Sequence, residues 1–198
     1  MRRTLPLLLA AALLPTLALA QATPRRIRGT ITALDGNTLT VQSREGEAVK
    51  IQLAPSYSVA AVIPATLADA KPGTFIGTAA TGPKDRLRAA EVLIFPEALR
   101  GSGEGHFPWD LMPESTMTNA TIESESAGTD GQDLMLSAKG EKLRVTVPAG
   151  TPIVTFAPGD AAMLKPGAKV FIGAQAAPDG TLTAARVNVG KDGLTPPM

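Results

Sequence analysis

The chain contains one sequence pattern twice, and this duplication is the feature that most limits how it can fold. The tripeptide Lys71–Gly73 returns as Lys165–Gly167. Each copy is followed by Phe-Ile-Gly, at Phe75–Gly77 and Phe171–Gly173, and then by an Ala-Ala-charge-Val segment. Two copies of one pattern predict two copies of one small fold, because the same side-chain spacing has the same packing requirements each time.

Strand patterns recur in both copies, and helix patterns are weak. Apolar and polar residues alternate in Val49–Leu53 and again in Leu143–Val147, which is typical of a strand with one buried face. A short helix is expected before each Lys-Pro-Gly, over Pro64–Ala70 and over Asp160–Leu164, with Asp160 as the N-cap of the second. Each copy then has three strands, a short helix and two strands, which is the order of an OB-like barrel.

We therefore expect an all-β protein with two tandem small OB-like β-barrels. The expected boundaries are a signal peptide over residues 1–20, a first repeat over 21–100, a bridge over 101–117, a second repeat over 118–190, and a C-terminal tail over 191–198.

The beginning of the chain has the pattern of an export signal. Arg2 and Arg3 precede an apolar run over Leu5–Leu19, and Ala18–Ala20 forms an A-x-A cleavage site before Gln21. Cleavage between Ala20 and Gln21 predicts a periplasmic or secreted protein. No later stretch reaches the length of a membrane-spanning helix, so the mature chain is not expected to span a membrane.

Charge and cysteine content exclude several functions. Nineteen Lys and Arg residues are nearly balanced by 18 Asp and Glu residues, for a net charge of +1. This balance gives no electrostatic reason to expect nucleic-acid binding. The chain has no cysteine, which excludes disulfides, thiol nucleophiles and thiolate metal sites.

The bridge holds the only histidine and the only tryptophan of the chain, His106 and Trp109. With Glu104 and Asp110, His106 offers an imidazole and two carboxylates, a donor set that could hold a divalent metal as cofactor. The spacing is not one of the known ligand spacings, and one histidine supplies a weak nitrogen set. The alternative is structural: Trp109 and Phe107 fill the junction between two barrels.

Catalysis is not expected from the motifs present. A Ser-His-Asp triad would have to use His106 with Ser102 or Ser115, and neither serine lies in a nucleophile-elbow pattern. Phosphate-binding glycine loops are also missing from the sequence. An uncharacterised hydrolase remains an alternative.

Four aromatic residues are candidates for ligand binding. Tyr57 and Phe156 precede the expected short helices of their copies, and Phe107 and Trp109 lie in the bridge. OB-like barrels bind ligands on one face, where aromatic side chains can stack. The same residues could instead cover a barrel end.

The repeat resembles an exported bacterial β-domain family of unknown function with OB-like character. The resemblance is carried by an apolar residue, Lys-Pro-Gly, an Asp-Gly turn and an Ala-rich last strand; Lys84-Asp85 replaces Asp-Gly in copy one. The whole chain is similar to a narrower group of exported proteobacterial proteins in three segments: Gly103–Leu111, Ser115–Asn119 and Gly193–Met198. Members of this group are often labelled as metal ABC transporter permeases, a label that conflicts with a chain lacking several spanning helices.

The sequence thus favours a non-catalytic binding or structural module of the cell envelope. Its partner would be an unknown envelope protein or a small ligand. The first alternative is a soluble metal-binding accessory of a transport system that uses His106 and the nearby carboxylates. The second alternative is the hydrolase.

Overall fold

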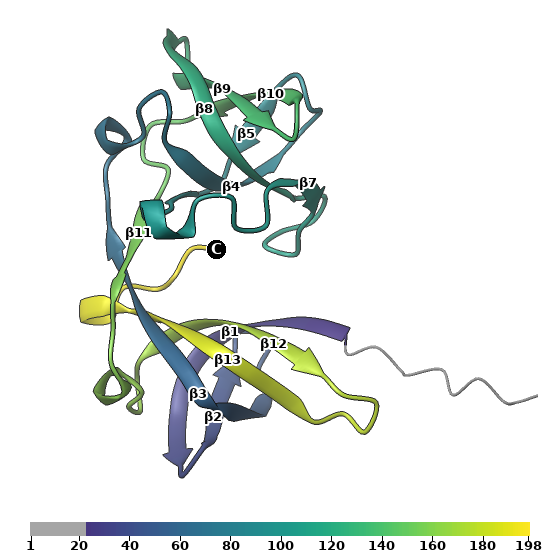
Figure 1. The fold of residues 1–198 in the computed structure, drawn as a ribbon, viewed down its shortest axis with the longest axis vertical. Helices are drawn as coiled ribbons and strands as arrows, with labels where there is room; N and C mark the ends of the chain where they lie inside the picture. Colours follow the sequence, from purple (N-terminus) through teal and green to yellow (C-terminus); the bar gives the residue numbers. More distant parts are fainter. Residues whose placement is uncertain (1–22) are drawn as a thin grey trace, which may run out of the picture.

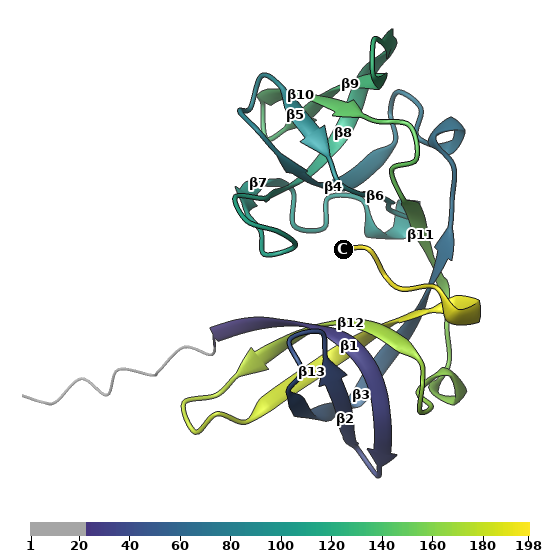
Figure 2. The same ribbon diagram turned by 180° about the vertical axis from the view of Figure 1, so that it is seen from behind.

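Strands make up nearly all the regular structure of this protein. The computed structural model describes residues 23–198, which form thirteen strands and four single-turn 3₁₀ helices (Figures 1 and 2). The predicted signal peptide and its cleavage site lie outside the described residues. Within residues 23–198, none of the helices is long and apolar enough to cross a membrane.

Five strands close into a barrel, which we call strand ring 1. Pairing runs from β1 to β2 to β3 to β13 to β12 and back to β1. All these pairs are antiparallel except β3–β13, which is parallel. The strands are β1 (Thr23–Asp35), β2 (Thr38–Ser43), β3 (Ala48–Pro64), β12 (Lys169–Ala176) and β13 (Leu182–Gly190).

A second set of five strands is paired in the same cyclic order, and we call it strand ring 2. Pairing runs from β8 to β9 to β10 to β5 to β4 and back to β8, and β10–β5 is the parallel pair. The strands are β4 (Phe75–Thr81), β5 (Leu87–Ala89), β8 (Thr116–Gly128), β9 (Gly131–Ala138) and β10 (Glu141–Val147).

Each strand ring takes strands from both sequence copies. Ring 1 combines the first three strands of copy one (β1, β2, β3) with the last two of copy two (β12, β13). Ring 2 combines the first three strands of copy two (β8, β9, β10) with β4 and β5 of copy one. The expected boundaries 21–100 and 118–190 therefore do not coincide with the two rings. The physical reason is that the alternation of side chains along a strand determines only which face of the strand is buried. A neighbouring strand from the same copy and one from the other copy meet that requirement equally well.

The duplicated Lys-Pro-Gly turns lie at the points of this strand exchange. The amide of Gly73 donates to the carbonyl of Ile122 in β8 at 2.8 Å, and the amide of Gly167 donates to Ile31 in β1 at the same distance. Each turn of one copy is thus bonded to the first strand of the other copy. Both glycines have φ of 90°, a left-handed conformation that explains why the tripeptide ends in glycine.

Two further strands, β6 (Val92–Ile94) and β11 (Ile153–Pro158), join the two rings into one sheet, and β7 (Gly105–Pro108) extends ring 2 by pairing with β8. The end of β3 pairs with β11, β11 pairs with β6, and β6 pairs with β4. Figure 1 shows β3 and β11 crossing together from one ring to the other. The two crossing segments are antiparallel, and Val62 of the first lies opposite Phe156 of the second.

Alternating side chains build a separate apolar core inside each ring. Ile31, Leu39 and Ile51 are almost fully buried in ring 1, and Leu136 and Val145 are fully buried in ring 2. A third, smaller cluster lies between the rings. It contains the buried Val62, Leu93, Val154 and Met198, with Phe95, Phe156, Phe171 and Leu194 packed against them.

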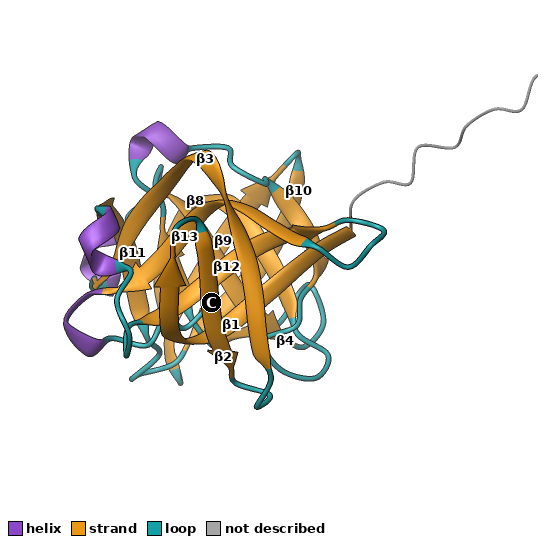
Figure 3. Cartoon of the chain, turned by 90° about the horizontal axis from the view of Figure 1, so that it is seen from below, coloured by secondary structure: helices purple, strands orange, loops and turns teal. Residues whose placement is uncertain are grey.

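The expected short helices are present as single 3₁₀ turns, and they lie on one side of the strands (Figure 3). The expected N-cap is confirmed, because the Asp160 carboxylate accepts from the Ala162 amide at 2.9 Å. The four turns are η1 (Leu67–Asp69), η2 (Glu97–Leu99), η3 (Ala161–Met163) and η4 (Lys191–Gly193).

Strand exchange makes the two halves of the chain mutually dependent. We predict that fragments 21–100 and 101–198, each produced alone, do not melt cooperatively as monomers, because each would leave open strand edges and a divided core. Produced together, they should form a one-to-one complex with the far-ultraviolet circular dichroism of the intact chain. Size-exclusion chromatography and thermal melting test this, and a half that folds stably as a monomer would contradict it.

Candidate functional site

The bridge is ordered by its own backbone bonds and lies between the rings. The Trp109 amide donates to the carbonyl of Ser115 at 2.8 Å, which closes a tight loop. The buried hydroxyl of Ser115 donates to the Met112 carbonyl at 2.8 Å and accepts from the Met112 amide at 3.2 Å. The loop therefore presents Asp110 in a fixed position, with β7 and β8 anchoring it to ring 2.

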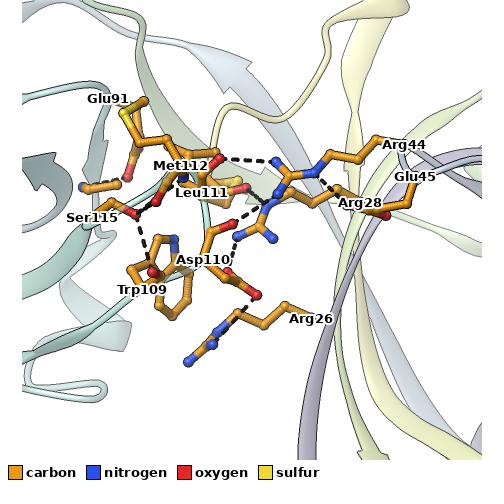
Figure 4. Close-up of polar contacts among 12 residues, drawn as sticks. Arg26, Arg28, Arg44, Glu45, Glu91, Trp109, Asp110, Leu111, Met112 and Ser115 are labelled. Atoms are coloured by element: carbon orange, nitrogen blue, oxygen red, sulfur yellow. Dashed lines mark hydrogen bonds and ion pairs between the residues drawn. The ribbon is translucent and has the colours of Figure 1, made fainter.

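Asp110 is the ion-pair partner of two arginines of ring 1 (Figure 4). Its carboxylate accepts from Nη2 of Arg28 at 2.7 Å and lies 3.7 Å from Nη1 of Arg26. Arg28 is 8% exposed, and its Nε donates to the main-chain oxygen of Met198 at 2.7 Å. One buried guanidinium of β1 therefore holds both the bridge and the final residue of the sequence.

Arg44, directly after β2 in ring 1, also forms hydrogen bonds with the same loop. Its Nη2 donates to the main-chain oxygen of Asp110 at 2.9 Å, and its Nη1 donates to that of Leu111 at 3.3 Å. We call the group of Arg26, Arg28, Arg44, Asp110 and Leu111 the inter-ring clamp. Planar guanidinium groups suit this role because they present several donors at fixed angles.

Trp109 lies next to the clamp in an aromatic cluster. The Arg26 guanidinium carbon is 3.9 Å from the centre of the indole, a close cation–π contact. The indole centre is 6.0 Å from that of Phe107 and 6.3 Å from that of Phe171 on β12. The indole Nε1 is buried without a hydrogen-bond partner, which costs stability that the surrounding contacts must offset.

Charge on the clamp is balanced in a way that favours the ionised carboxylate. Partial burial raises the pKa of Asp110, but the hydrogen bond and charge of Arg28, together with the charge of Arg26, outweigh it. The pKa of Asp110 is therefore below its ordinary value, and the ion pair is intact at neutral pH.

The three predicted metal ligands each have a separate partner. Glu104 accepts from the Lys139 amide at 2.8 Å, and Nδ1 of His106 is 2.8 Å from the Thr118 hydroxyl. Asp110 is held by the clamp arginines. Among residues 23–198, no group of three or more His, Asp or Glu side chains is arranged to hold a metal ion. The structure thus does not bring together the donor set that the sequence suggested.

The expected alternative of a Ser-His-Asp triad is not assembled either. Thr118, rather than a serine, contacts the only imidazole, and the Ser115 hydroxyl is engaged by the backbone of its own loop. Partial burial and the charge of Lys84 lower the pKa of His106. Burial and the Lys84 charge therefore favour the neutral imidazole.

Three of the four predicted ligand-binding aromatics lie between the rings. Phe107 and Trp109 belong to the cluster at the clamp, and Phe156 lies 6.2 Å from Phe95, centre to centre. Arg186 covers Phe156, with its guanidinium carbon 4.7 Å from the centre of the aromatic side chain. Tyr57 lies apart and packs against the core of ring 1. Their role in ligand binding stays a prediction.

Glu91 is a buried acid that no sequence motif indicates. It is fully buried between β5 and β6, where Oε1 accepts from the Ala79 amide at 2.9 Å and Oε2 has no partner. In Figure 4 it lies across the bridge loop from the arginines. Burial raises the pKa of Glu91 to about 8, against the smaller opposing effects of the Ala79 amide and the Arg28 charge. The equivalent position in copy two is Arg186, so the repeat gave no sign of a buried acid.

Comparisons with models of protein families, with curated proteins and with solved structures give no match to this chain.

The Asp110→Ala variant tests the clamp. We expect a loss of about 1–2 kcal/mol in the free energy of unfolding, because the buried Arg28 loses a charged hydrogen-bond partner that is itself half exposed. Urea denaturation measures this loss. The matched control is Glu45→Ala, which removes the exposed carboxylate beside Arg44 and should leave stability unchanged. Equal effects of the two substitutions would contradict a specific role for Asp110.

Glu91 predicts a pH dependence of stability. Its pKa of about 8 in the folded chain lies above the ordinary 4.5, so unfolding releases a proton between these values. Stability from this group is therefore complete below pH 4.5 and is lost as the pH rises towards about 8. Melting temperatures measured across this window should fall for the wild type and fall less for Glu91→Gln. Parallel curves for the two proteins would show that Glu91 does not cause the dependence.

Proposed function

We propose that the protein is a non-catalytic binding or structural module of the cell envelope. The observation that carries the proposal is that charged and aromatic side chains of the bridge contact ring 1 and so hold the two strand rings together. A bridge of this kind makes one rigid platform from two rings. The surfaces of that platform are then available to a partner or a ligand.

We assign both strand rings to an OB-like architecture. The support is the cyclic order of five strands in each ring, with a single 3₁₀ turn before the fourth strand. A shared architecture indicates a family of shapes and leaves the function to the site, so it does not by itself name a ligand.

Export to the periplasm or to the medium is also proposed. Its support is the signal-peptide pattern of residues 1–20. Expression of the full chain in a Gram-negative host, followed by fractionation and mass spectrometry, should give a periplasmic or released form that begins at Gln21. An uncleaved chain retained in the cytoplasm would contradict export.

Metal titration separates the proposed role from the metal-binding accessory. We expect Zn²⁺, Cu²⁺, Ni²⁺ and Mn²⁺ to leave the melting temperature of the mature protein unchanged. A metal ion that bound only the folded state would raise the melting temperature by mass action. His106→Ala serves as the matched variant, since it removes the only imidazole. A metal-induced rise that disappears in this variant would overturn the proposal in favour of metal handling.

A further inference from the structure

Ring 2 carries an open polar pocket of about 720 Å³. It is lined by the end of β4, by three residues of the loop that follows it, by Thr129 and Asp130 near the turn between β8 and β9, and by residues of β5, β9 and β10. These strands lie together at the upper end of the molecule in Figure 1. None of the clamp residues lines this pocket, so it is separate from the inter-ring contacts described above.

The floor of the pocket is pre-organised by hydrogen bonds. The Asp133 carboxylate, 13% exposed, accepts from Nη2 of Arg144 at 2.6 Å and from the Thr146 hydroxyl at 2.6 Å. These two hydrogen bonds lower the pKa of Asp133 and keep it ionised. At the rim, Arg88 forms an ion pair with Asp130. Donors and acceptors are therefore fixed side by side before any ligand arrives.

The fold does not require this concentration of charge. Strand register places Thr38 opposite Gln52 in ring 1, as Asp133 is opposite Thr146 in ring 2. The positions of Arg144 and Arg88 correspond to Lys50 and Thr183 in ring 1. The same outward positions thus carry one charged residue in ring 1 and three in ring 2, although both rings close in the same way.

We propose that this pocket binds a neutral polyhydroxylated ligand, a saccharide. Its lining contains three arginines and three aspartates, so its formal charge sums to zero and favours neither a strong anion nor a cation. A sugar hydroxyl can accept from a guanidinium and donate to the neighbouring carboxylate at the same time. No aromatic side chain is among the lining residues, so the pocket offers no stacking surface for a nucleobase. The proposal rests on the binding role proposed above and adds its site and ligand class.

Isothermal titration calorimetry of the mature protein tests it, with maltotriose, cellotriose and chitotriose as probes. We expect at least one of them to bind, with little change between low and high salt, because the ligand is neutral. Asp133→Asn should weaken binding about tenfold or more, since it removes a charged acceptor. Lys50→Gln, at the ring 1 position that corresponds to Arg144, should leave affinity unchanged.

A second variant tests the pocket independently if Asp133→Asn destabilises ring 2. Arg86 lines the pocket, is exposed and makes no ion pair within residues 23–198, so Arg86→Ser should weaken binding without lowering the melting temperature. Failure of all three sugars to bind would overturn the saccharide proposal, as would affinities unaffected by both variants. Binding of heparin in preference to the sugars, weakened by salt, would overturn it in favour of an anion site.

These outcomes are distinguishable from failure of the proposed function. A protein that binds no sugar, yet shows no metal-induced shift dependent on His106, would lose the ligand class and keep its role as a non-catalytic module. A metal shift lost in His106→Ala would overturn that role whatever the sugars do.

Discussion

The parallel pairing of β3 with β13 and of β10 with β5 is the constraint on which the rest of the structure depends. Without it, each ring would be an open sheet with an exposed edge and a core uncovered on one side. Both pairs join strands from different sequence copies. The crossing segments β3 and β11 must then run together, and the space between the rings must be filled by the side chains of that junction.

The inter-ring clamp is the polar part of the same junction. Arg28 is nearly buried, and a buried guanidinium is tolerated only when its donors are satisfied. Asp110 and the main-chain oxygen of Met198 meet that requirement from two different segments. The apolar cluster around Phe156 and the aromatic contacts of Trp109 lie on the same junction, so burial and ion pairing favour one relative placement of the rings.

Much of the architecture could be predicted from local sequence, and its connectivity could not. Alternation in Val49–Leu53 predicted a half-buried strand, and Asp160 predicted a helix cap, because both signals act over a few residues. The choice between a ring closed within one copy and a ring closed by exchange depends on contacts between distant strands, on which alternation gives no information.

Parts of the candidate site could likewise be predicted from the sequence, and other parts could not. The sequence indicated an unrepeated bridge, and one interpretation of its aromatic residues was that they fill the junction between two barrels. The grouping of Glu104, His106 and Asp110 relied on closeness in sequence, whereas β7 and the loop after it separate their side chains and give each another partner. Glu91 gave no signal because its counterpart in the repeat is an arginine, and burial of a single acid depends on long-range packing.

Strand exchange also sets an order on folding. Strands β1, β2 and β3 are synthesised before the others, but their barrel is completed by β12 and β13 from the other end of the described chain. Their edges therefore stay open until β12 and β13 have been synthesised, and contacts of such long sequence separation form slowly. During this interval the early strands are exposed to wrong pairing, including pairing with another nascent copy.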